Sequence, residues 1–482
     1  MSTILYYAKN DTGKKLVKSI TDIIPKTNVS EETISGHQHL KINIPVLGPN
    51  NATVEINEPA AIKLALDKEG STRVHRLNRL MTYDEDAKND KMVREYKITM
   101  LNLQPVKVSR KDNSSAAAQS AGWKAVDLNE EKEREIRKTL VSGRIAVQSL
   151  GLDFALVHLG LNKLQNIFVI SIDPSPALGN FRIEKLARFA VEYMTGEWNS
   201  NEVMLGADPE FMMVENSKDR LIVASTFFPR FGDVGCDNLR VRNRQQRPIA
   251  ELRPAPSSNP LILTDNIRRT MVQALKLAPY RNIRWLAGSL PVDEYPIGGH
   301  VHFSKIALSS KLLRALDNYL AIPVLLMENA DTSAKRRKKY GLLSDFRTKE
   351  YGGFEYRTLS SWIVNPTITR GVLSMAKVIA LNHLQLKENI FTEPDAHEAF
   401  YSGDKEYFMN YYTYMWKKLI SLPGAYDYVP YMQEINELCH SPEGWNEYLN
   451  IRETWDLPNV KKVYREKSSK RNSSTRVSVR VR

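Results

Sequence analysis

Four short segments of the chain carry charged or imidazole side chains at two-residue spacing. The pairs are Asp208 and Glu210, Glu251 and Arg253, His300 and His302, and Glu355 and Arg357. Side chains alternate along a β-strand, so both members of a pair share one face while apolar neighbours occupy the other. One such pair is typical of an ordinary half-exposed strand. Four together, rich in carboxylates that are costly to bury unless a cation neutralises them, indicate a shared site.

The residue types in these pairs favour one kind of chemistry. Carboxylates suit a hard divalent cation such as Mg²⁺ or Mn²⁺. Arginine side chains suit phosphate oxygens, which they bind through paired hydrogen bonds. No serine or cysteine nucleophile stands out beside them. The set therefore predicts phosphoryl transfer that works by positioning and charge neutralisation.

The motifs around these pairs follow a recognisable order. Glutamine-synthetase-like enzymes show the same succession as Gly206–Phe211, Gly299–Ser304 and Phe354–Arg357. The whole stretch 203–375 resembles the phage-encoded carboxylate–amine ligase family of that fold, with further support from Gly235–Asp237, Glu251–Pro256 and Tyr340–Arg347. The resemblance implies an α+β fold in which an antiparallel sheet, lined with ligands for metal and ATP, is flanked by helices.

The same resemblance implies a role for each residue of the set. A divalent metal, Mg²⁺ or Mn²⁺, would be held around the ATP phosphates by Asp208, Glu210, Glu251, His300 and Glu355. His302 would lie near the nucleotide. Three catalytic arginines would face phosphates or the carboxylate substrate, the last two also binding the nucleotide: Arg253, Arg347 and Arg357. The γ-phosphate of ATP would pass to a carboxylate, and an amine would attack the acyl phosphate to form an amide.

Two details of this assignment stay open. The first open detail is how many metal ions bind, because Asp208 stands where glutamine synthetase has the longer Glu. The second is the identity of the general base, because the candidates Asp233, Asp237 and Asp345 are also typical of turns.

The N-terminal region resembles a shortened ATP-grasp ligase in four pieces: Asn57–Lys68, Arg94–Lys97, Gly151–Ala155 and Ile172–Pro176. Too few residues separate Lys68 from Arg94 for the glycine-rich segment that covers ATP. The positions expected to carry the metal-binding acids read His158 and Ser171, and the expected Asn reads Asp173. Neither His nor Ser replaces a carboxylate that bridges magnesium to phosphate. We therefore expect an inactive, degenerate ATP-grasp-like α+β domain that presents a substrate or mediates assembly.

Composition separates a basic C-terminal segment from the rest of the chain. It has 482 residues and a net charge of +13, and residues 461–482 hold nine Lys and Arg with one acid, Glu466. Such a segment buries too little apolar surface to fold alone, so we expect it to be disordered. It suits nucleic acid or another polyanion through counterion release, although a purely solubilising tail fits equally well. The predicted domains are residues 1–196, 197–460 and 461–482.

Cysteine content and hydropathy bear on the compartment. Two cysteines, Cys236 and Cys439, exclude a disulfide framework and suggest a reducing environment. The longest apolar run, Tyr319–Met327, is too short to cross a membrane, and the N-terminus shows no secretory signal. The cytoplasm is expected, of the host if the chain is phage-encoded, with no membrane partner. The oligomeric state stays open.

Two hypotheses about function remain. The first is an ATP-dependent ligase acting on the carboxylate and amine of a peptide, protein, amino acid or nucleobase. The second is a catalytically inactive binding or structural protein, of a virion for example, that uses its basic tail on nucleic acid or a protein partner. A second basic cluster, residues 335–339, is interpreted either as a solvated loop or as an attractant for a polyphosphate.

Overall fold

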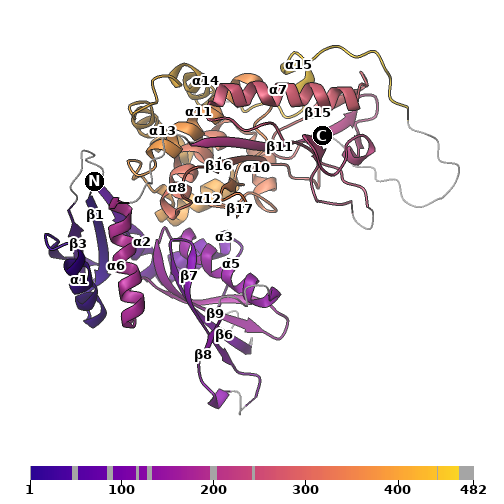
Figure 1. The fold of residues 1–482 in the computed structure, drawn as a ribbon. Helices are drawn as coiled ribbons and strands as arrows, with labels where there is room; N and C mark the ends of the chain where they lie inside the picture. Colours follow the sequence, from indigo (N-terminus) through magenta and orange to yellow (C-terminus); the bar gives the residue numbers. More distant parts are fainter. Residues whose placement is uncertain are drawn as a thin grey trace. The chain divides into compact units, whose positions relative to one another are not determined.

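The computed structural model of the chain describes residues 2–45, 53–83, 91–115, 119–127, 133–195, 203–241, 245–441 and 443–465. The chain divides into two compact units (Figure 1). Unit 1 comprises Met1–Trp198, Ser309–Ala315 and His383–Glu398, and unit 2 comprises Asn199–Leu308, Leu316–Asn382 and Ala399–Arg482. The domain boundary expected at residue 196, and the tail beyond residue 465, lie outside the described residues.

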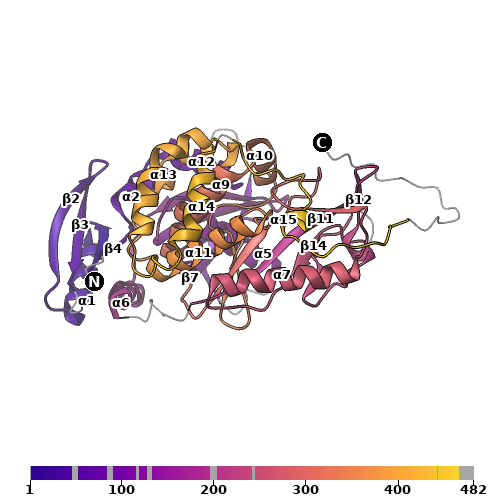
Figure 2. The same cartoon turned by 90° about the horizontal axis from the view of Figure 1, so that it is seen from above.

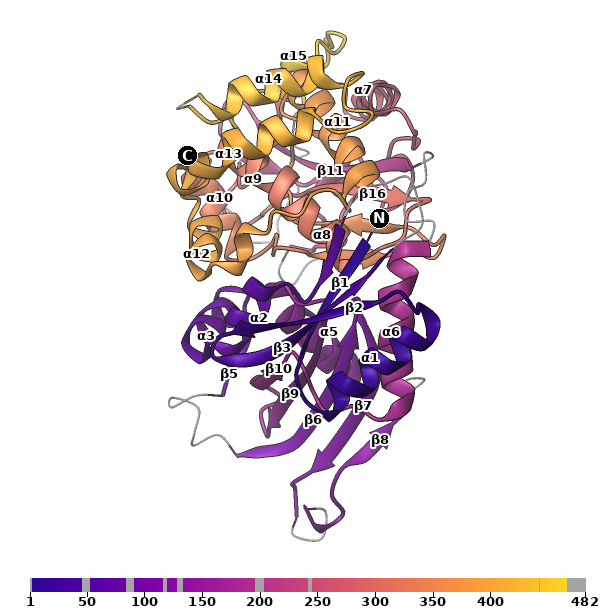
Figure 3. The ribbon, with the colours of Figure 1, turned by 90° about the vertical axis from the view of Figure 1, so that its left-hand side faces the viewer.

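The first sheet of unit 1 has four strands in the order β2-β3-β1-β4. They are β1 (Ser2–Ala8), β2 (Asn28–Ile34), β3 (His37–Ile44) and β4 (Thr53–Ile56). Two helices, α1 (Asp11–Ile23) and α6 (Asn180–Thr195), pack beside this sheet (Figure 3). Helix α1 begins where the Asn10 side chain accepts a hydrogen bond from the Gly13 amide, a typical N-cap. Leucine, isoleucine and aromatic side chains of both helices and the sheet form one buried cluster.

The second sheet of unit 1 has six strands in the order β5-β10-β9-β6-β7-β8. They are β5 (Met81–Thr82), β6 (Met92–Leu101), β7 (Gln104–Asp112), β8 (Lys124–Val126), β9 (Phe154–Asn162) and β10 (Ile167–Asp173). The helices that accompany it are α2 (Pro59–Leu66), α3 (Lys68–Leu77) and α5 (Arg134–Ser149). Alternate residues of β6, such as Tyr96 and Ile98, join the buried cluster, whereas Glu95 and Lys97 are half-exposed on the opposite face.

The sheet of unit 2 has eight strands built around one long strand, β11 (Met204–Glu215). The order is β13-β14-β11-β16-β18-β17, and β12 and β15 also pair with β11. The other strands are β12 (Arg220–Ile222), β13 (Val234–Cys236), β14 (Ala250–Leu252), β15 (Ile283–Leu286), β16 (Gly299–Ser304), β17 (Phe346–Thr348) and β18 (Phe354–Tyr356). All these pairings are antiparallel.

Helices flank the sheet of unit 2. Helix α7 (Pro260–Leu277) lies against β11, β13 and β14 and packs on α11 (Pro366–Asn382) (Figure 2). Helix α11 is buried on almost all sides, as its apolar composition requires. The remaining helices are α8 (Ser310–Leu316), which begins within unit 1, α9 (Ile322–Met327), α10 (Ala330–Arg337), α12 (Pro394–Ser402), α13 (Lys405–Ile420), α14 (Val429–Cys439) and α15 (Ile451–Thr454).

The architecture confirms the predicted α+β class, including an antiparallel sheet with flanking helices over the second half of the chain. Among the described residues, no helix is both long enough and apolar enough to cross a membrane.

Candidate active site

Strand register brings the predicted ligands of unit 2 onto one sheet face. Residues that lie directly opposite each other in antiparallel strands have neighbouring side chains on the same face. The opposed residues are Asp208 and His300, Glu210 and Glu251, His302 and Glu355, and Arg347 and Glu355. The two-residue spacing in four separate segments therefore becomes a continuous polar strip across β14, β11, β16, β18 and β17.

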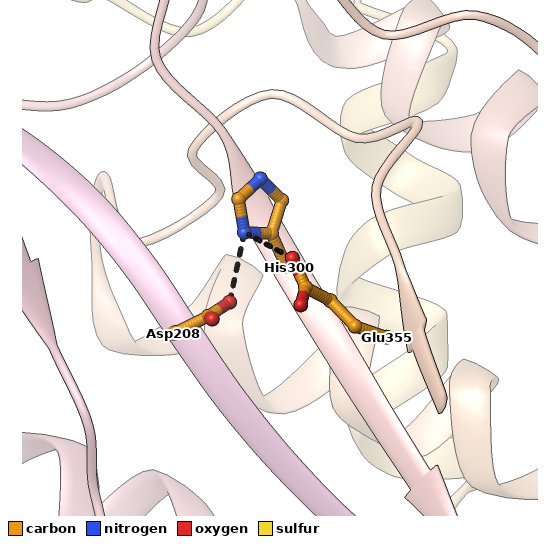
Figure 4. A group of neighbouring side chains, drawn as sticks. All are labelled: Asp208, His300 and Glu355. Carbon is orange, nitrogen blue, oxygen red and sulfur yellow. Dashed lines mark hydrogen bonds and ion pairs between the residues drawn. The ribbon is translucent and has the colours of Figure 1, made fainter. Parts of the chain in front are cut away.

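The centre of this strip is a buried group of Asp208, His300 and Glu355 (Figure 4). His300 Nδ1 lies 2.8 Å from Asp208 Oδ1 and 3.3 Å from Glu355 Oε1. One ligand atom from each residue lies within 4.8 Å of the other two. Two carboxylate oxygens and an imidazole nitrogen are a donor set that divalent cations accept. These three residues therefore fit a metal ion by chemistry, proximity and burial.

Tyr340 determines which nitrogen of His300 faces the carboxylates. Its hydroxyl oxygen lies 2.8 Å from His300 Nε2 and accepts a hydrogen bond from Arg357 Nη2 at 2.6 Å. The hydrogen bond between His300 Nε2 and the Tyr340 hydroxyl leaves Nδ1 directed at Asp208 and Glu355. Metal-binding histidines are commonly oriented in this way by an acceptor on the second nitrogen. Space beside the ring is limited, because a Cβ on Gly298 would lie 2.4 Å from His300 Nε2.

Electrostatics couple the central group tightly. Burial lowers the pKa of His300, but the carboxylates of Asp208, Glu210 and Glu355 together outweigh this and raise it to about 9. Burial raises the pKa of Asp208, yet His300 and His302 hold it below its usual range. Without a metal, the imidazolium is thus the local counter-cation of the carboxylates.

Glu210 and Glu251 form a second acidic group beside the first. Glu210 accepts a hydrogen bond from the Gly298 amide at 2.6 Å, and Glu251 is ion-paired with Arg253. Burial is the main reason that the pKa of Glu210 rises to about 7 and that of Glu251 to about 8. For Glu251 the negative charge of Asp208 adds to this rise and outweighs Arg253. Two buried carboxylates in so negative a setting also fit a cation.

Three cations converge on Glu355, whose side chain is completely buried. Arg347 donates from Nε to Oε2 at 2.9 Å and from Nη2 to Oε1 at 2.8 Å. Lys349 Nζ lies 2.5 Å from Oε2, and Arg357 Nε lies 3.0 Å from Oε1. The Arg347 side chain is half-exposed, so it has room to turn toward an anionic ligand.

Lys349 and Asp317 are site residues that sequence reasoning missed. Lys349 stands two residues after Arg347, so the same two-residue spacing could have identified it. Asp317 lies in a π-helical turn, Asp317–Ala321, and its Oδ1 accepts hydrogen bonds from the Tyr356 hydroxyl at 2.7 Å and the Ser344 amide at 2.9 Å. It thereby holds strand β18 between Glu355 and Arg357. No local pattern identifies it, because its partners are remote in sequence.

The remaining predicted residues lie at the edge of the strip or support it. His302 Nε2 lies 3.0 Å from Asp208 Oδ2, and Tyr351 approaches its Nδ1 at 3.4 Å. Arg253 donates to the Gly232 carbonyl at 3.1 Å as well as binding Glu251, so its guanidinium is largely used within the unit.

The three candidates for the general base have different contacts. Asp345 lies 3.6 Å from Arg357. Asp237 accepts from the Leu239 amide at 2.7 Å, as a turn residue does. Asp233 is exposed, and its backbone carbonyl accepts from the Arg253 amide at 2.7 Å.

Both interpretations of residues 335–339 were wrong for Arg336 and Arg337. These residues end helix α10, and both side chains are buried. Arg336 donates to the carbonyls of Ile297, Thr358 and Leu359, and Arg337 is ion-paired with Glu328. They stabilise the segments next to the site and are not available to a polyphosphate.

In unit 1, the positions expected to carry metal-binding acids lie on neighbouring strands. His158 on β9 is opposite Ser171 on β10, and its Nε2 lies 2.7 Å from Glu95 Oε2. Asp173 ends β10 and accepts from the Ser175 amide at 2.9 Å. The described part of unit 1 contains no group of three or more His, Cys, Asp or Glu placed to hold a metal.

Comparison with known proteins gives partial structural similarities and one family match. An ATP-grasp ligase from Chryseobacterium gregarium, solved with ADP and a leader and core peptide, is 8% identical over 40% of this chain and 96% of its own, with a TM-score of 0.25. A macrocyclase from Microcystis aeruginosa bound to a precursor peptide is 9% identical over 39% and 98%, with a TM-score of 0.26. The glutamine synthetase of Plasmodium falciparum is 11% identical over 66% and 76%, with a TM-score of 0.25.

No curated protein matches the chain significantly. The model of one protein family, "Phage phiEco32-like COOH.NH2 ligase-type 2", matches residues 205–457. This match covers more than half of the chain and includes every residue of the polar strip. The chain therefore belongs to the phage phiEco32-like COOH–NH2 ligase family, type 2.

Proposed function

We propose that the protein is an ATP-dependent carboxylate–amine ligase that forms an amide or peptide-like bond through an acyl phosphate. The observation that carries this proposal is the buried group of Asp208, His300 and Glu355, with three cations arranged around its carboxylate end. Residues 197–460 would form the glutamine-synthetase-like catalytic domain.

The proposed ligands of Mg²⁺ or Mn²⁺ divide into the two groups described above. Asp208, His300 and Glu355 would form one set of ligands, and Glu210 with Glu251 the other. When bound, the metal would withdraw charge from phosphate oxygens. His302, on the edge of the strip beside Asp208, is placed to meet the nucleotide.

The arginines would act on the transferred phosphate. Arg347 and Arg357 each hold Glu355 in the structure, and each has further N–H groups to offer a phosphate. Arg357 is held by Tyr340 and Glu355 before the ligand arrives, so it needs little reorganisation as charge develops, whereas the half-exposed Arg347 can turn toward the phosphate. Arg253 is proposed to act from the opposite end of the strip, beside Glu251.

The proposed reaction has two steps. A carboxylate oxygen of the substrate attacks the γ-phosphorus of ATP, the bond to the bridging oxygen breaks, and ADP leaves. The amine nitrogen then attacks the acyl carbon, the bond to phosphate breaks, and phosphate leaves with the electron pair. The proton lost by the amine passes to phosphate or water, and the sum is ADP, phosphate and an amide.

The substrate class is a separate part of the proposal. We propose a carboxylate and an amine belonging to a peptide, protein, amino acid or nucleobase, modified by a phage-encoded enzyme in the host cytoplasm. Residues 1–196 are proposed to be a degenerate ATP-grasp-like domain that presents substrate or mediates assembly. In support, His158 is engaged with Glu95 and faces Ser171 rather than a second carboxylate.

The alternative is a catalytically inactive binding or structural protein. Its support is the unbalanced positive charge of residues 461–482. The basic tail would then be the functional element, acting on nucleic acid or a protein partner. The site in unit 2 speaks against this alternative, because a fold kept only for binding has no need of five buried acids and imidazoles on one strip.

The test is magnesium-dependent ATP consumption by the full-length protein, with and without pools of amino acids and short peptides. Products are identified by mass spectrometry. Formation of ADP together with an acceptor product that has lost one water is the expected result. A wild-type protein that neither binds ATP with Mg²⁺ nor consumes it with any pool would contradict the proposal.

A further inference from the structure

The last described residues of the chain are fastened to unit 2 by an aromatic cluster. The Tyr464 ring lies 5.5 Å from the rings of Phe227 and Tyr280, which lie 5.2 Å from each other. Asn282 donates from Nδ2 to the Tyr464 carbonyl at 3.1 Å and accepts from the Tyr464 amide at 2.7 Å. The start of the basic segment 461–482 thus has a defined position on unit 2.

This anchor concentrates cations. Lys461, Lys462 and Arg465 are exposed, as is Arg281, whose amide donates to the Lys462 carbonyl at 2.8 Å. None of the four forms an ion pair with another described residue. Six further Lys and Arg follow in residues 466–482, against the single acid Glu466. The positive charge of Arg281, Lys461, Lys462 and Arg465 is therefore not paired with acids of the described residues.

The anchor is also connected to the candidate active site. Phe227 and Phe228 belong to the segment that leads into strand β13, and Phe228 lies 6.0 Å from Phe211, the residue after Glu210. Further along the same segment, the Gly232 carbonyl accepts from Arg253. The segment 227–232 therefore contacts Tyr464 of the anchor, Phe211 beside Glu210, and Arg253 beside Glu251.

Exposed aromatic and arginine side chains lie on this connecting segment. Phe231 is 70% exposed, and the Arg230 guanidinium lies 4.7 Å from its ring centroid. Arg230 donates to Asn238 and forms no ion pair among the described residues. An exposed ring beside unpaired cations is the arrangement that proteins use to stack bases and neutralise phosphates of single strands.

We propose that this surface, made of Arg230, Phe231, Arg281, Lys461, Lys462 and Arg465, binds single-stranded nucleic acid next to the site of unit 2. An acidic polypeptide would engage the cations but has no base to stack on Phe231, so the exposed ring favours the nucleic acid. The proposal concerns binding and does not depend on the ligase assignment.

The first test measures fluorescence anisotropy of a labelled oligothymidylate of about 20 nucleotides, longer than the site of one binding fold. The full-length protein is compared with the triple variant K461Q/K462Q/R465Q over a range of salt concentrations. Three lost phosphate contacts, at roughly 0.7 each, should reduce the slope of log affinity against log salt by about 2. At low salt the affinity should fall roughly tenfold or more.

The matched control is K14Q/K15Q/K18Q, which removes three exposed lysines of helix α1 in unit 1. It changes the net charge equally, and its affinity and salt slope should equal those of the wild type. If both triple variants lose affinity to the same extent, the binding reflects net charge alone and the proposed surface is wrong.

The second test removes the ring. Phe231→Ala should weaken oligothymidylate binding roughly fivefold or more, because base stacking is lost. The control is Phe181→Ala on helix α6, where the ring is 66% exposed and Lys185 lies 5.3 Å from its centroid. Unchanged binding by Phe231→Ala, or competition by poly-glutamate as effective as by unlabelled oligothymidylate, would overturn the nucleic-acid proposal in favour of an acidic polypeptide.

Discussion

Replacement of Tyr340 by Phe tests how the candidate metal site is held. The substitution removes one hydroxyl and leaves the ring in place. That oxygen is hydrogen-bonded to His300 Nε2 at 2.8 Å and accepts from Arg357 Nη2 at 2.6 Å. Burial holds the pKa of Tyr340 far above its usual value, so the group acts as a neutral hydroxyl.

The expected loss of Mn²⁺ affinity follows from the hydrogen-bond partner that His300 loses. A buried donor without a partner costs about 1–3 kcal/mol. Arg357 keeps its contact with Glu355, so most of this cost falls on His300, which loses the hydrogen bond that holds its Nδ1 toward Asp208. Each 1.4 kcal/mol is about tenfold in a binding constant, so Mn²⁺ affinity should fall about 10- to 100-fold.

The assay is Mn²⁺ titration followed by calorimetry or by the electron paramagnetic resonance signal of free Mn²⁺. The matched control is Tyr351→Phe, which removes the same atom from a residue that is 63% exposed and whose hydroxyl oxygen lies 3.4 Å from His302 Nδ1. This control should bind Mn²⁺ as the wild type does. Wild-type affinity in Tyr340→Phe would show that His300 is not a metal ligand, or that Tyr340 does not orient it.

Other substitutions separate chemistry from stability. Glu251→Gln should abolish ATP turnover with little change in the free energy of unfolding. The neutral amide keeps the shape of a carboxyl group that is costly to ionise in this setting. Retained turnover in a folded variant would show that Glu251 is not a site residue. Glu355→Gln should abolish turnover and also destabilise unit 2 by about 3 kcal/mol, because three cations lose their shared counter-charge; urea unfolding measures this, and an unchanged midpoint would refute it. His158→Gln should leave turnover unchanged, and a large loss would mean that unit 1 takes part in the chemistry. Acidification should destabilise unit 1 through His75 and His397, whose pKa values burial lowers to about 4. Both are neutral when folded, so their contribution is complete above pH 6.5 and is lost, by roughly 3 kcal/mol each, as the pH falls to about 4; a flat profile of unfolding free energy over this range would contradict the assignment.

Much of the fold was predictable because its signals are local. Alternation in β11 places Leu205 and Phe211 on one face and Asp208 and Glu210 on the other. The structure confirms the strand, and its register sets Asp208 beside His300 and Glu210 beside Glu251. The family and the α+β class were likewise predictable, because the motif order is a property of the sequence itself. The roles of individual site residues stay predictions, although their convergence on one strip is now a structural fact.

Other features could not be predicted because they depend on partners remote in sequence. Arg336 and Arg337 look like a solvated basic run, yet three carbonyls from two separate segments hold Arg336 in the interior, and Glu328 holds Arg337 there. Periodicity could not identify Asp317 either, since its role exists only once Tyr356 and Ser344 reach it.

Which side chains share a strand face follows from the sequence alone, because the two-residue period is a property of each strand. The position of β11 between β14 and β16, which sets Asp208 beside His300 and Glu210 beside Glu251, is visible only in the folded molecule. Strand order and register arise from long-range pairing and burial, and a shift of one residue would turn every one of these side chains to the other face. The paired residues are local in origin, and the site that they form is a consequence of packing.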